Sequence, residues 1–267
     1  MPENKWSTAL KNLPLGLLHY FDKVDSTNDI ATKLLNEGAP NLSIVLANEQ
    51  LKGRGRNNRT WVTPKDTALA FSLILRPERE KIPLFSGLGS LAVCKTLQKK
   101  YSLPAKVKWP NDVLINGKKV AGILAEAHWL GNQLRGVILG IGINVTPQSV
   151  PLDIKLNFPA TSVEQELGDE VSRADLLRDV LVELLEWYPR LNTGALLQAW
   201  EENLAYKGEI IRLSVGDDSP IRGRILGLNP DASLRLELSP REEKSFQVGE
   251  IHRAIAYEVC KYPHLHL

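Results

Sequence analysis

Val113-Leu114-Ile115-Asn116-Gly117-Lys118-Lys119-Val120 is the segment with the clearest local fold signal in this sequence. Apolar and β-branched residues flank its Asn-Gly pair. This arrangement favours a two-residue type I′ turn, because both central positions of that turn need φ > 0. The segment therefore predicts a tight antiparallel hairpin. Apolar runs at residues 123–126 and 134–143 are expected to add further strands to the same sheet.

The turn also determines which side chains of the hairpin lie together. Ile115 pairs with Lys118 and Leu114 pairs with Lys119, and side chains alternate between the two faces of a strand. Asp112 then shares a face with Lys119 and lies diagonally from it, whereas Lys118 points the other way, into solvent. We expect Asp112 and Lys119 in one site. A plain cross-strand ion pair is the alternative that the hairpin alone leaves open.

Segments on either side of the hairpin alternate between helical and strand patterns. Apolar residues at helical spacing, with capping residues at the ends, predict helices at residues 26–36, 84–101, 172–188 and 194–206. Short apolar runs predict strands at residues 44–47 and 69–75. The pattern indicates the α+β class, with a mixed sheet packed by helices.

The sequence changes character at Lys207. Gly, Asp, Asn and Pro separate short apolar runs at residues 210–215, 221–226, 233–238 and 251–257. Such spacing is typical of a small all-β module. A chain of 267 residues has room for one large and one small domain. We therefore expect a first domain over residues 1–206 and a second over residues 207–267.

Composition narrows the class of protein. The net charge of +2, from 33 basic and 31 acidic residues, argues against the broad basic face of a genome-binding protein. No apolar run of about 18 residues and no secretory signal occur, so we expect a cytoplasmic protein without membrane contact. Two cysteines make no disulfide framework, and Cys94 is expected in the core. The five histidines lack metal-ligand spacing, so we expect no protein-ligated metal.

Basic residues are concentrated in Gly53-Arg54-Gly55-Arg56-Asn57-Asn58-Arg59-Thr60-Trp61. Guanidinium groups offer paired donors that match carboxylate and phosphate oxygens, and glycines let a backbone approach a ligand closely. We expect a loop that folds over an anionic small molecule and becomes ordered around it. A solvated basic loop or a nucleic-acid patch is the alternative.

Two further stretches suit a ligand. Gly140 and Gly142 alternate in an apolar strand, where glycine often marks the close approach of a ligand or another backbone, and Asn144 shares their face. Ser26-Thr27-Asn28 brings hydroxyls and an amide to a helix start, which suits a polar ring with a urea-like group. The respective alternatives are strand-on-helix packing and helix capping. A G-x-G-x-x-A pattern from Gly87 lies inside a helical pattern, so we reject it as a nucleotide site.

Together these blocks, in this order, resemble the biotin–protein ligases. They are Asp25-Ser26-Thr27-Asn28, the arginine segment, Lys108-Trp109-Pro110-Asn111-Asp112, Lys119-Val120-Ala121-Gly122-Ile123-Leu124 and Gly140-Ile141-Gly142-Ile143-Asn144. The resemblance implies a catalytic domain followed by a small SH3-like β-barrel. It also implies an enzyme that uses ATP, with Mg²⁺ on the phosphates, to convert biotin to biotinyl-5′-AMP. Biotin then passes to one lysine of a biotin carboxyl carrier protein.

The resemblance also implies roles for individual residues. Biotin would be contacted by Ser26, Thr27, Asn28 and Gln50, with Gly122, Leu124 and Gly140 as pocket walls. The loop that closes over biotin and the adenylate would be Arg54, Gly55 and Arg56. The nucleotide would lie near Arg59, Trp61, Lys108, Asn111 and Asn144, together with Arg56 and Lys119. Lys119 would contact the biotin carboxylate and the reacting phosphate, and Asp112 would orient or deprotonate the incoming lysine. The implied catalytic set is Lys119, Arg54, Asp112 and Lys108.

The sequence departs from the family pattern at Asn57-Asn58, where many relatives have Arg-Gly. Asn tolerates the left-handed conformation, so the turn is expected to survive with one cation fewer. Two alternatives stay open: a lipoate–protein ligase of the same fold, and a repressor that uses biotinyl-AMP as corepressor. The 20 residues before Phe21 are too few for a helix-turn-helix, so we expect no specific nucleic-acid partner. The sequence leaves open whether the protein is a monomer or a homodimer.

Overall fold

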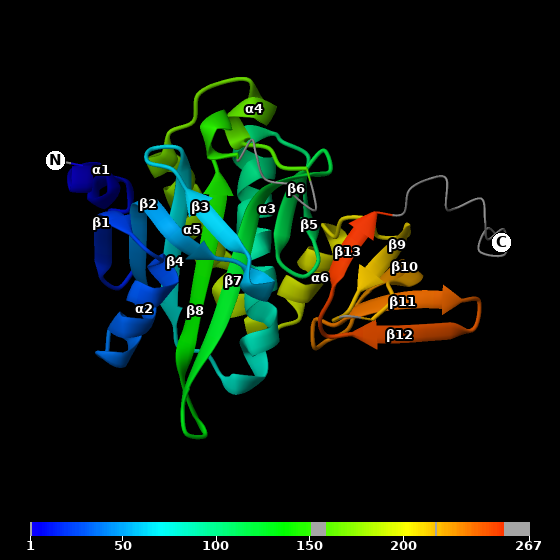
Figure 1. Ribbon diagram of the computed structural model, residues 1–267. Helices are drawn as coiled ribbons and strands as arrows, with labels where there is room; N and C mark the ends of the chain where they lie inside the picture. Colours follow the sequence, from blue (N-terminus) through cyan, green and yellow to red (C-terminus); the bar gives the residue numbers. More distant parts are fainter. Residues whose placement is uncertain (1, 151–158, 217, 254–267) are drawn as a thin grey trace.

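A mixed eight-stranded sheet forms the larger part of the protein. The computed structural model describes residues 2–150, 159–216 and 218–253 (Figure 1). The strand order is β1-β2-β4-β8-β7-β6-β5, with β3 paired to β2 off this path. β1 runs parallel to β2, and the other paired strands of this sheet are antiparallel. The predicted mixed sheet is therefore confirmed.

The strands of this sheet are β1 Leu18–Val24, β2 Ser43–Arg54, β3 Thr60–Thr63, β4 Ala68–Leu75, β5 Ala105–Lys108, β6 Asp112–Ile115, β7 Lys118–Leu130 and β8 Gln133–Asn144. The α-helices are α1 Pro2–Ala9, α2 Thr27–Asn36, α3 Phe85–Tyr101, α4 Val163–Leu167, α5 Arg173–Trp187 and α6 Ala195–Glu202. Short 3₁₀ turns are η1 Arg56–Asn58, η2 Arg79–Leu84, η3 Pro147–Ser149 and η4 Tyr188–Asn192.

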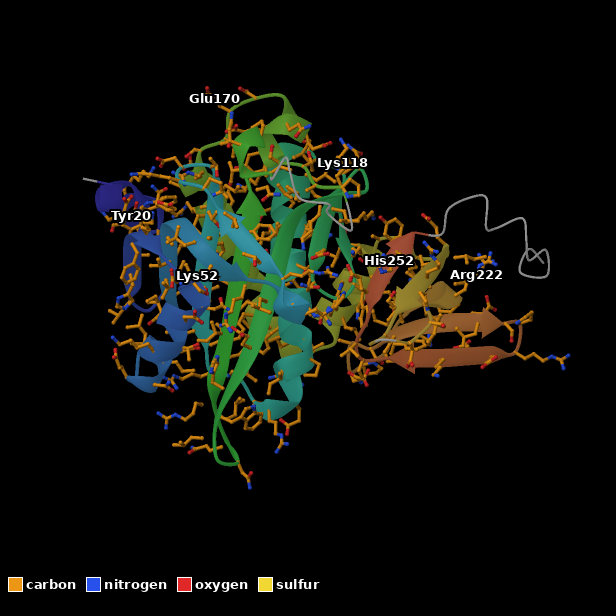
Figure 2. All side chains as sticks on the ribbon, in the orientation of Figure 1. Tyr20, Lys52, Lys118, Glu170, Arg222 and His252 are labelled. Atoms are coloured by element: carbon orange, nitrogen blue, oxygen red, sulfur yellow. The ribbon has the colours of Figure 1, made fainter. Side chains whose placement is uncertain are left out.

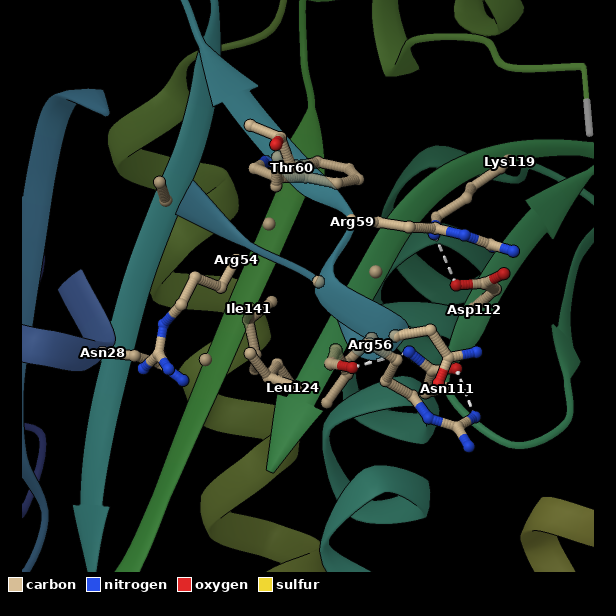
Figure 3. Close-up of a pocket in the computed structure, with 18 of the residues that line it drawn as sticks. Asn28, Arg54, Arg56, Arg59, Thr60, Asn111, Asp112, Lys119, Leu124 and Ile141 are labelled. Atoms are coloured by element: carbon tan, nitrogen blue, oxygen red, sulfur yellow. Dashed lines mark hydrogen bonds and ion pairs between the residues drawn. The ribbon is translucent and has the colours of Figure 1, made fainter. Parts of the chain in front are cut away.

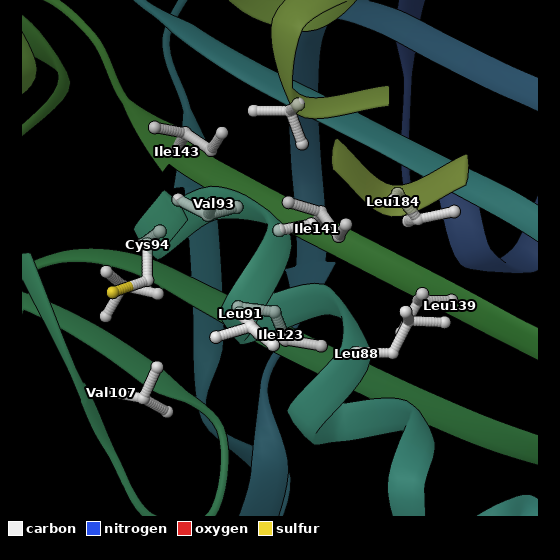
Figure 4. Packing of buried hydrophobic residues seen from close by; sticks show 14 of the residues in the cluster. Leu88, Leu91, Val93, Cys94, Val107, Ile123, Leu139, Ile141, Ile143 and Leu184 are labelled. Atoms are coloured by element: carbon white, nitrogen blue, oxygen red, sulfur yellow. The ribbon is translucent and has the colours of Figure 1, made fainter. Parts of the chain in front are cut away.

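Helices cover both faces of the sheet. On one face, α3 buries Leu88 and Leu91 near Ile123 and Leu139 of the sheet, in a core that includes α5 (Figure 4). On the other face, α2 packs a smaller cluster around Leu35. A Cβ atom on Gly87 would overlap the Trp200 ring of α6, so this glycine serves helix packing. This agrees with rejecting the G-x-G-x-x-A pattern as a nucleotide site.

The predicted hairpin has the expected register. Asn116 and Gly117 both have positive φ, 50° and 77°, and Leu114 pairs with Lys119. A β-bulge next to this pair leaves Val120 as an extra residue, so Asp112 faces Gly122. The expected strands at 118–120 and 123–126 are one continuous strand, β7.

A second, five-stranded antiparallel sheet follows, in the order β12-β11-β10-β9-β13, and fits an SH3-like domain. Its strands are β9 Ile210–Ser214, β10 Ile221–Leu228, β11 Leu234–Ser239, β12 Glu242–Phe246 and β13 Glu250–Arg253. β12 was not expected, because it carries charges instead of an apolar run. The predicted strand at 251–257 begins in β13, and its residues 254–257 lie outside the described residues. Cys260, His264 and His266 lie outside them as well.

Three expectations need correction. The helix predicted at 194–206 ends at Glu202. Ser26 occupies the N-cap position of α2, but its side chain makes no capping hydrogen bond. The strand predicted at 44–47 runs on to Arg54, so the start of the arginine segment belongs to the sheet.

The described helices include none that is long and apolar enough to cross a membrane.

Candidate active site

A cavity of about 500 Å³ lies over the sheet face that carries α2, beneath the ribbon formed by β2, η1 and β3 (Figure 3). Every site residue inferred from the sequence lines it. These are Ser26, Thr27, Asn28, Gln50, Arg54, Gly55, Arg56, Arg59, Trp61, Lys108, Asn111, Asp112, Lys119, Gly122, Leu124, Gly140 and Asn144. The fold therefore brings together residues spread over more than a hundred positions.

One end of the cavity is polar and buried. Gln50 Oε1 accepts hydrogen bonds from the backbone N–H of Thr27 at 2.9 Å and from its hydroxyl at 3.0 Å. The Asn28 amide donates to Glu126 at 2.7 Å, and its oxygen accepts from Ser72 at 2.6 Å. These contacts hold both amide side chains in one orientation, so the polar end is ready to receive a ligand with matching donors and acceptors.

The ribbon over the cavity depends on a close backbone contact at Gly53 and on a left-handed backbone conformation at Asn57. A Cβ atom on Gly53 would overlap the carbonyl oxygen of Trp61, its partner across the ribbon. Asn57 adopts the left-handed conformation, with φ 55° and ψ 42°. The turn expected to survive the departure from the family pattern is therefore present.

Carboxylates hold two arginines of the ribbon. Arg54 contacts Asp29 at 2.8 Å and Glu126 at 2.9 Å. The Arg59 guanidinium donates two hydrogen bonds to Glu250 of β13, which lower the pKa of that carboxyl below its usual value. Arg56 donates to Asn111 at 3.3 Å, and burial lowers the pKa of its guanidinium.

The glycines of the sheet make room for side chains above them. A Cβ atom on Gly142 would lie 2.5 Å from the Trp61 indole, and one on Gly140 would overlap the Asn28 amide. Trp61 therefore rests on a glycine surface, with Lys119 Nζ 5.6 Å from its ring centroid. The close approach expected at these glycines is present: Trp61 of the ribbon approaches Gly142, and Asn28 of α2 approaches Gly140.

The other end of the cavity contains two lysines around one carboxylate. Asp112 lies 2.6 Å from Lys119 Nζ and 3.4 Å from Lys108 Nζ. Burial works to raise the pKa of Asp112, but the two ammonium groups outweigh burial and lower this pKa below its usual value. Burial lowers the pKa of Lys108. Two cations and one anion leave a net positive charge, which suits an anionic ligand.

Lys118 needs a correction. Its pairing with Ile115 places it on the opposite face from Lys119, as expected, but it does not simply point into solvent. Figure 2 labels Lys118 among the side chains of the protein. Its ammonium contacts Glu166 at 3.1 Å, and 42% of its side chain is exposed.

Sequence reasoning missed several residues of the site. Glu126 follows Gly122 and Leu124 at alternate positions of β7, and this period of two was a visible signal. Glu250 and Ser72 follow no predicted site residue at this spacing, so no such signal marked them. Glu250 also lines the cavity, so the small sheet contributes to the site.

The cavity thus has a polar, buried end and a cationic end, and the ribbon with its arginines covers both. This arrangement defines a site for a small molecule that carries or acquires negative charge. The chain belongs to the biotin/lipoate A/B protein ligase family, whose model matches residues 20–144. The bifunctional ligase/repressor BirA of Bacillus subtilis is 33% identical over 92% of this chain and 77% of the relative.

Another relative is named only as a ligase. The biotin–[acetyl-CoA-carboxylase] ligase of Paracoccus denitrificans is 36% identical over 73% of this chain and 83% of the relative. Among solved structures, a biotin protein ligase from Aquifex aeolicus in complex with biotin and ATP has a TM-score of 0.75 and 28% identity. That match covers 89% of this chain and 99% of the other chain.

Proposed function

We infer that this protein is an ATP-dependent biotin protein ligase. It activates biotin to biotinyl-5′-AMP and transfers biotin to a lysine of a biotin carboxyl carrier protein or domain. The observation that supports this most directly is the continuous cavity. It joins the buried polar groups around Thr27 and Gln50 to the cations at Lys108 and Lys119. A neutral ring with a carboxylate tail and a nucleotide phosphate match these two ends.

The first step brings two anions together. The biotin carboxylate attacks the α-phosphorus of ATP, the bond to the β-phosphate oxygen breaks, and pyrophosphate leaves. We propose that Lys119 contacts both the carboxylate and the α-phosphate, while Lys108, Arg56 and Arg59 neutralise the developing charge. Ser26, Thr27, Asn28 and Gln50 hold the biotin ring, between walls of Gly122, Leu124 and Gly140. Trp61, Asn111 and Asn144 contact the nucleotide.

The second step transfers biotin. The neutral amine of the carrier lysine attacks the acyl carbon, the acyl–phosphate bond breaks, AMP leaves, and the nitrogen releases one proton to solvent. Asp112 is a poor base, because its lowered pKa keeps it ionised and weakly basic. We therefore assign Asp112 to orienting Lys119 and the incoming amine, and Arg54 and Gly55 to covering the adenylate against water.

Mg²⁺ is expected with the ATP phosphates, where it neutralises phosphate charge when bound. The two carboxylates that line the cavity, Asp112 and Glu250, are each paired with cations. Within residues 2–150, 159–216 and 218–253 no group of three or more His, Cys, Asp or Glu side chains fits a metal.

The domain boundary after residue 206, a cytoplasmic location and the absence of a specific nucleic-acid partner stay predictions. A pyrophosphate-release assay with ATP and Mg²⁺ tests the function, with biotin and lipoate compared as substrates. We expect release with biotin, followed by labelling of one lysine on a carrier domain. Release and labelling with lipoate but not biotin would instead identify a lipoate–protein ligase.

A further inference from the structure

Sheet neighbours hold the backbone of Lys119 on both sides. β6 lies on one side, where Leu114 is the partner. β8 does not reach Lys119 on the other side, since its pairing with β7 begins at Ala121. Residues 159–161 take its place: Lys119 N–H donates to the Pro159 carbonyl at 2.7 Å, and Thr161 N–H donates to the Lys119 carbonyl at 2.9 Å. The placement of this short segment therefore determines where Lys119 lies.

Glu166 of α4 anchors that segment to the hairpin turn. Its Oε1 accepts from the Thr161 hydroxyl at 2.7 Å and lies 3.1 Å from Lys118 Nζ, while its Oε2 accepts from the Asn116 amide at 2.9 Å. Only 8% of the Glu166 side chain is exposed. Burial works to raise its pKa, but the three donors outweigh burial and lower the pKa, so Glu166 is a carboxylate at neutral pH.

The same segment also holds Asn144. The amide of Asn144 donates to the Thr161 carbonyl at 3.0 Å, and Thr161 is fully buried. Glu166 does not line the cavity, whereas Ala160, Lys119 and Asn144 do. Glu166 lies outside the cavity, but Thr161 connects it directly to Lys119 and Asn144, which face into the cavity. The biotin end is held by other residues: Thr27 and Gln50 through Ser72 and each other, and Asn28 through Ser72 and Glu126.

We propose that Glu166 is a positioning residue for the nucleotide end of the site. Through its hydrogen bond with Thr161 it keeps Lys119 and Asn144 directed at the reacting phosphate, and its contact with the partly exposed Lys118 contributes less. The proposal rests on the proposed function of the cavity. It explains why Lys118, on the outer side of the hairpin, has a nearly buried partner.

The test compares Glu166→Ala and Glu166→Gln with the wild-type chain, in single-turnover pyrophosphate release. Glu166→Ala is expected to lower the rate about 100-fold, the loss typical of a displacement of about 1 Å in a reacting geometry. Glu166→Gln keeps an acceptor for Thr161 but not the charge that pairs with Lys118, so its loss should be smaller. Biotin affinity, measured by calorimetry without ATP, should be unchanged. Glu170→Gln, an exposed carboxylate on the following loop, is the matched control and should behave as wild type.

A double-mutant cycle with Thr161→Val separates positioning from general damage. If Glu166 acts through Thr161, Glu166→Ala should cause little further loss in the Thr161→Val background. Additive losses, or a biotin affinity that falls with the rate, would overturn the proposal. If the wild-type chain releases no pyrophosphate with biotin, the proposed function fails. If it does and Glu166→Ala matches it, only this inference fails.

Discussion

Single side chains account for the charge of the site. Asp112 lies between Lys108 and Lys119; Lys108 and Asp112 are buried, and 27% of the Lys119 side chain is exposed. Removing one member of a buried ion group leaves uncompensated charge, which costs more than the intact group contributes. The carboxylate therefore stabilises the two lysines in the folded state as well as directing them.

The first prediction concerns Asp112→Asn. It should lower the free energy of unfolding by about 3 kcal/mol at pH 7, because two lysines lose their partner. The folded-state pKa of Asp112 is below its usual value of 3.8, so its stabilisation is complete above that pH and is lost as the pH falls through the lower folded-state pKa. Urea unfolding from pH 7 to pH 2 measures this. A wild-type advantage that persists undiminished at the acid end would contradict it.

The second prediction concerns the two neighbouring lysines of the hairpin. Lys119→Ala should slow adenylate formation by about 1000-fold, because it removes the cation nearest the reacting groups. Lys118→Ala should slow it by no more than about fivefold, since a partly exposed ion pair contributes little. Pyrophosphate release measures both. Equal losses would mean that the side chains do not face opposite ways.

Strands and helices place these side chains, and glycines set how closely the elements approach. β8 carries Gly142 beneath the Trp61 ring of β3, and α3 carries Gly87 against the Trp200 ring of α6. The two contacts are alike in chemistry but serve different purposes. One closes the cavity, and the other packs the core.

The third prediction compares alanine at these two glycines. Overpacking costs about 1–3 kcal/mol. Gly142→Ala should displace Trp61 and raise the KM for ATP by about tenfold, the equivalent of about 1.4 kcal/mol of binding. Gly87→Ala should lower the free energy of unfolding by about 1–3 kcal/mol and leave this KM unchanged. Steady-state kinetics and thermal unfolding measure the pair; the reverse pattern would show that Trp61 does not cover the nucleotide.

At the scale of the whole molecule, the smaller sheet closes one side of a site that lies mainly on the larger sheet. The Trp109 indole donates to the Ala232 carbonyl at 3.0 Å, and Glu250 holds Arg59. Figure 1 shows the smaller sheet beside β5, β6 and α6. The arginine segment is therefore less basic than its sequence indicates, because Arg54 and Arg59 already have carboxylate partners.

The fourth prediction follows from this neutralisation. DNA binding should be weak, strongly salt-dependent and indifferent to sequence, and biotin with ATP should reduce it further, because the same arginines serve both anions. A mobility-shift titration near physiological salt, with and without biotin and ATP, measures this. Sequence-specific binding that strengthens with biotinyl-AMP would contradict it and favour the repressor alternative.

Local chemistry in the sequence was enough to predict the hairpin, its register beside the turn, a left-handed turn at Asn57-Asn58 and the meeting of Asp112 with Lys119, but not the β-bulge at Val120. Turn geometry and the two-residue period of strands act over a few residues, so they can be read directly. The contacts of Arg59 with Glu250, 191 residues away, and of Lys118 with Glu166, 48 residues away, depended on the folded chain. No local rule specifies such partners, because the path of the whole backbone sets which distant carboxylate arrives beside each cation.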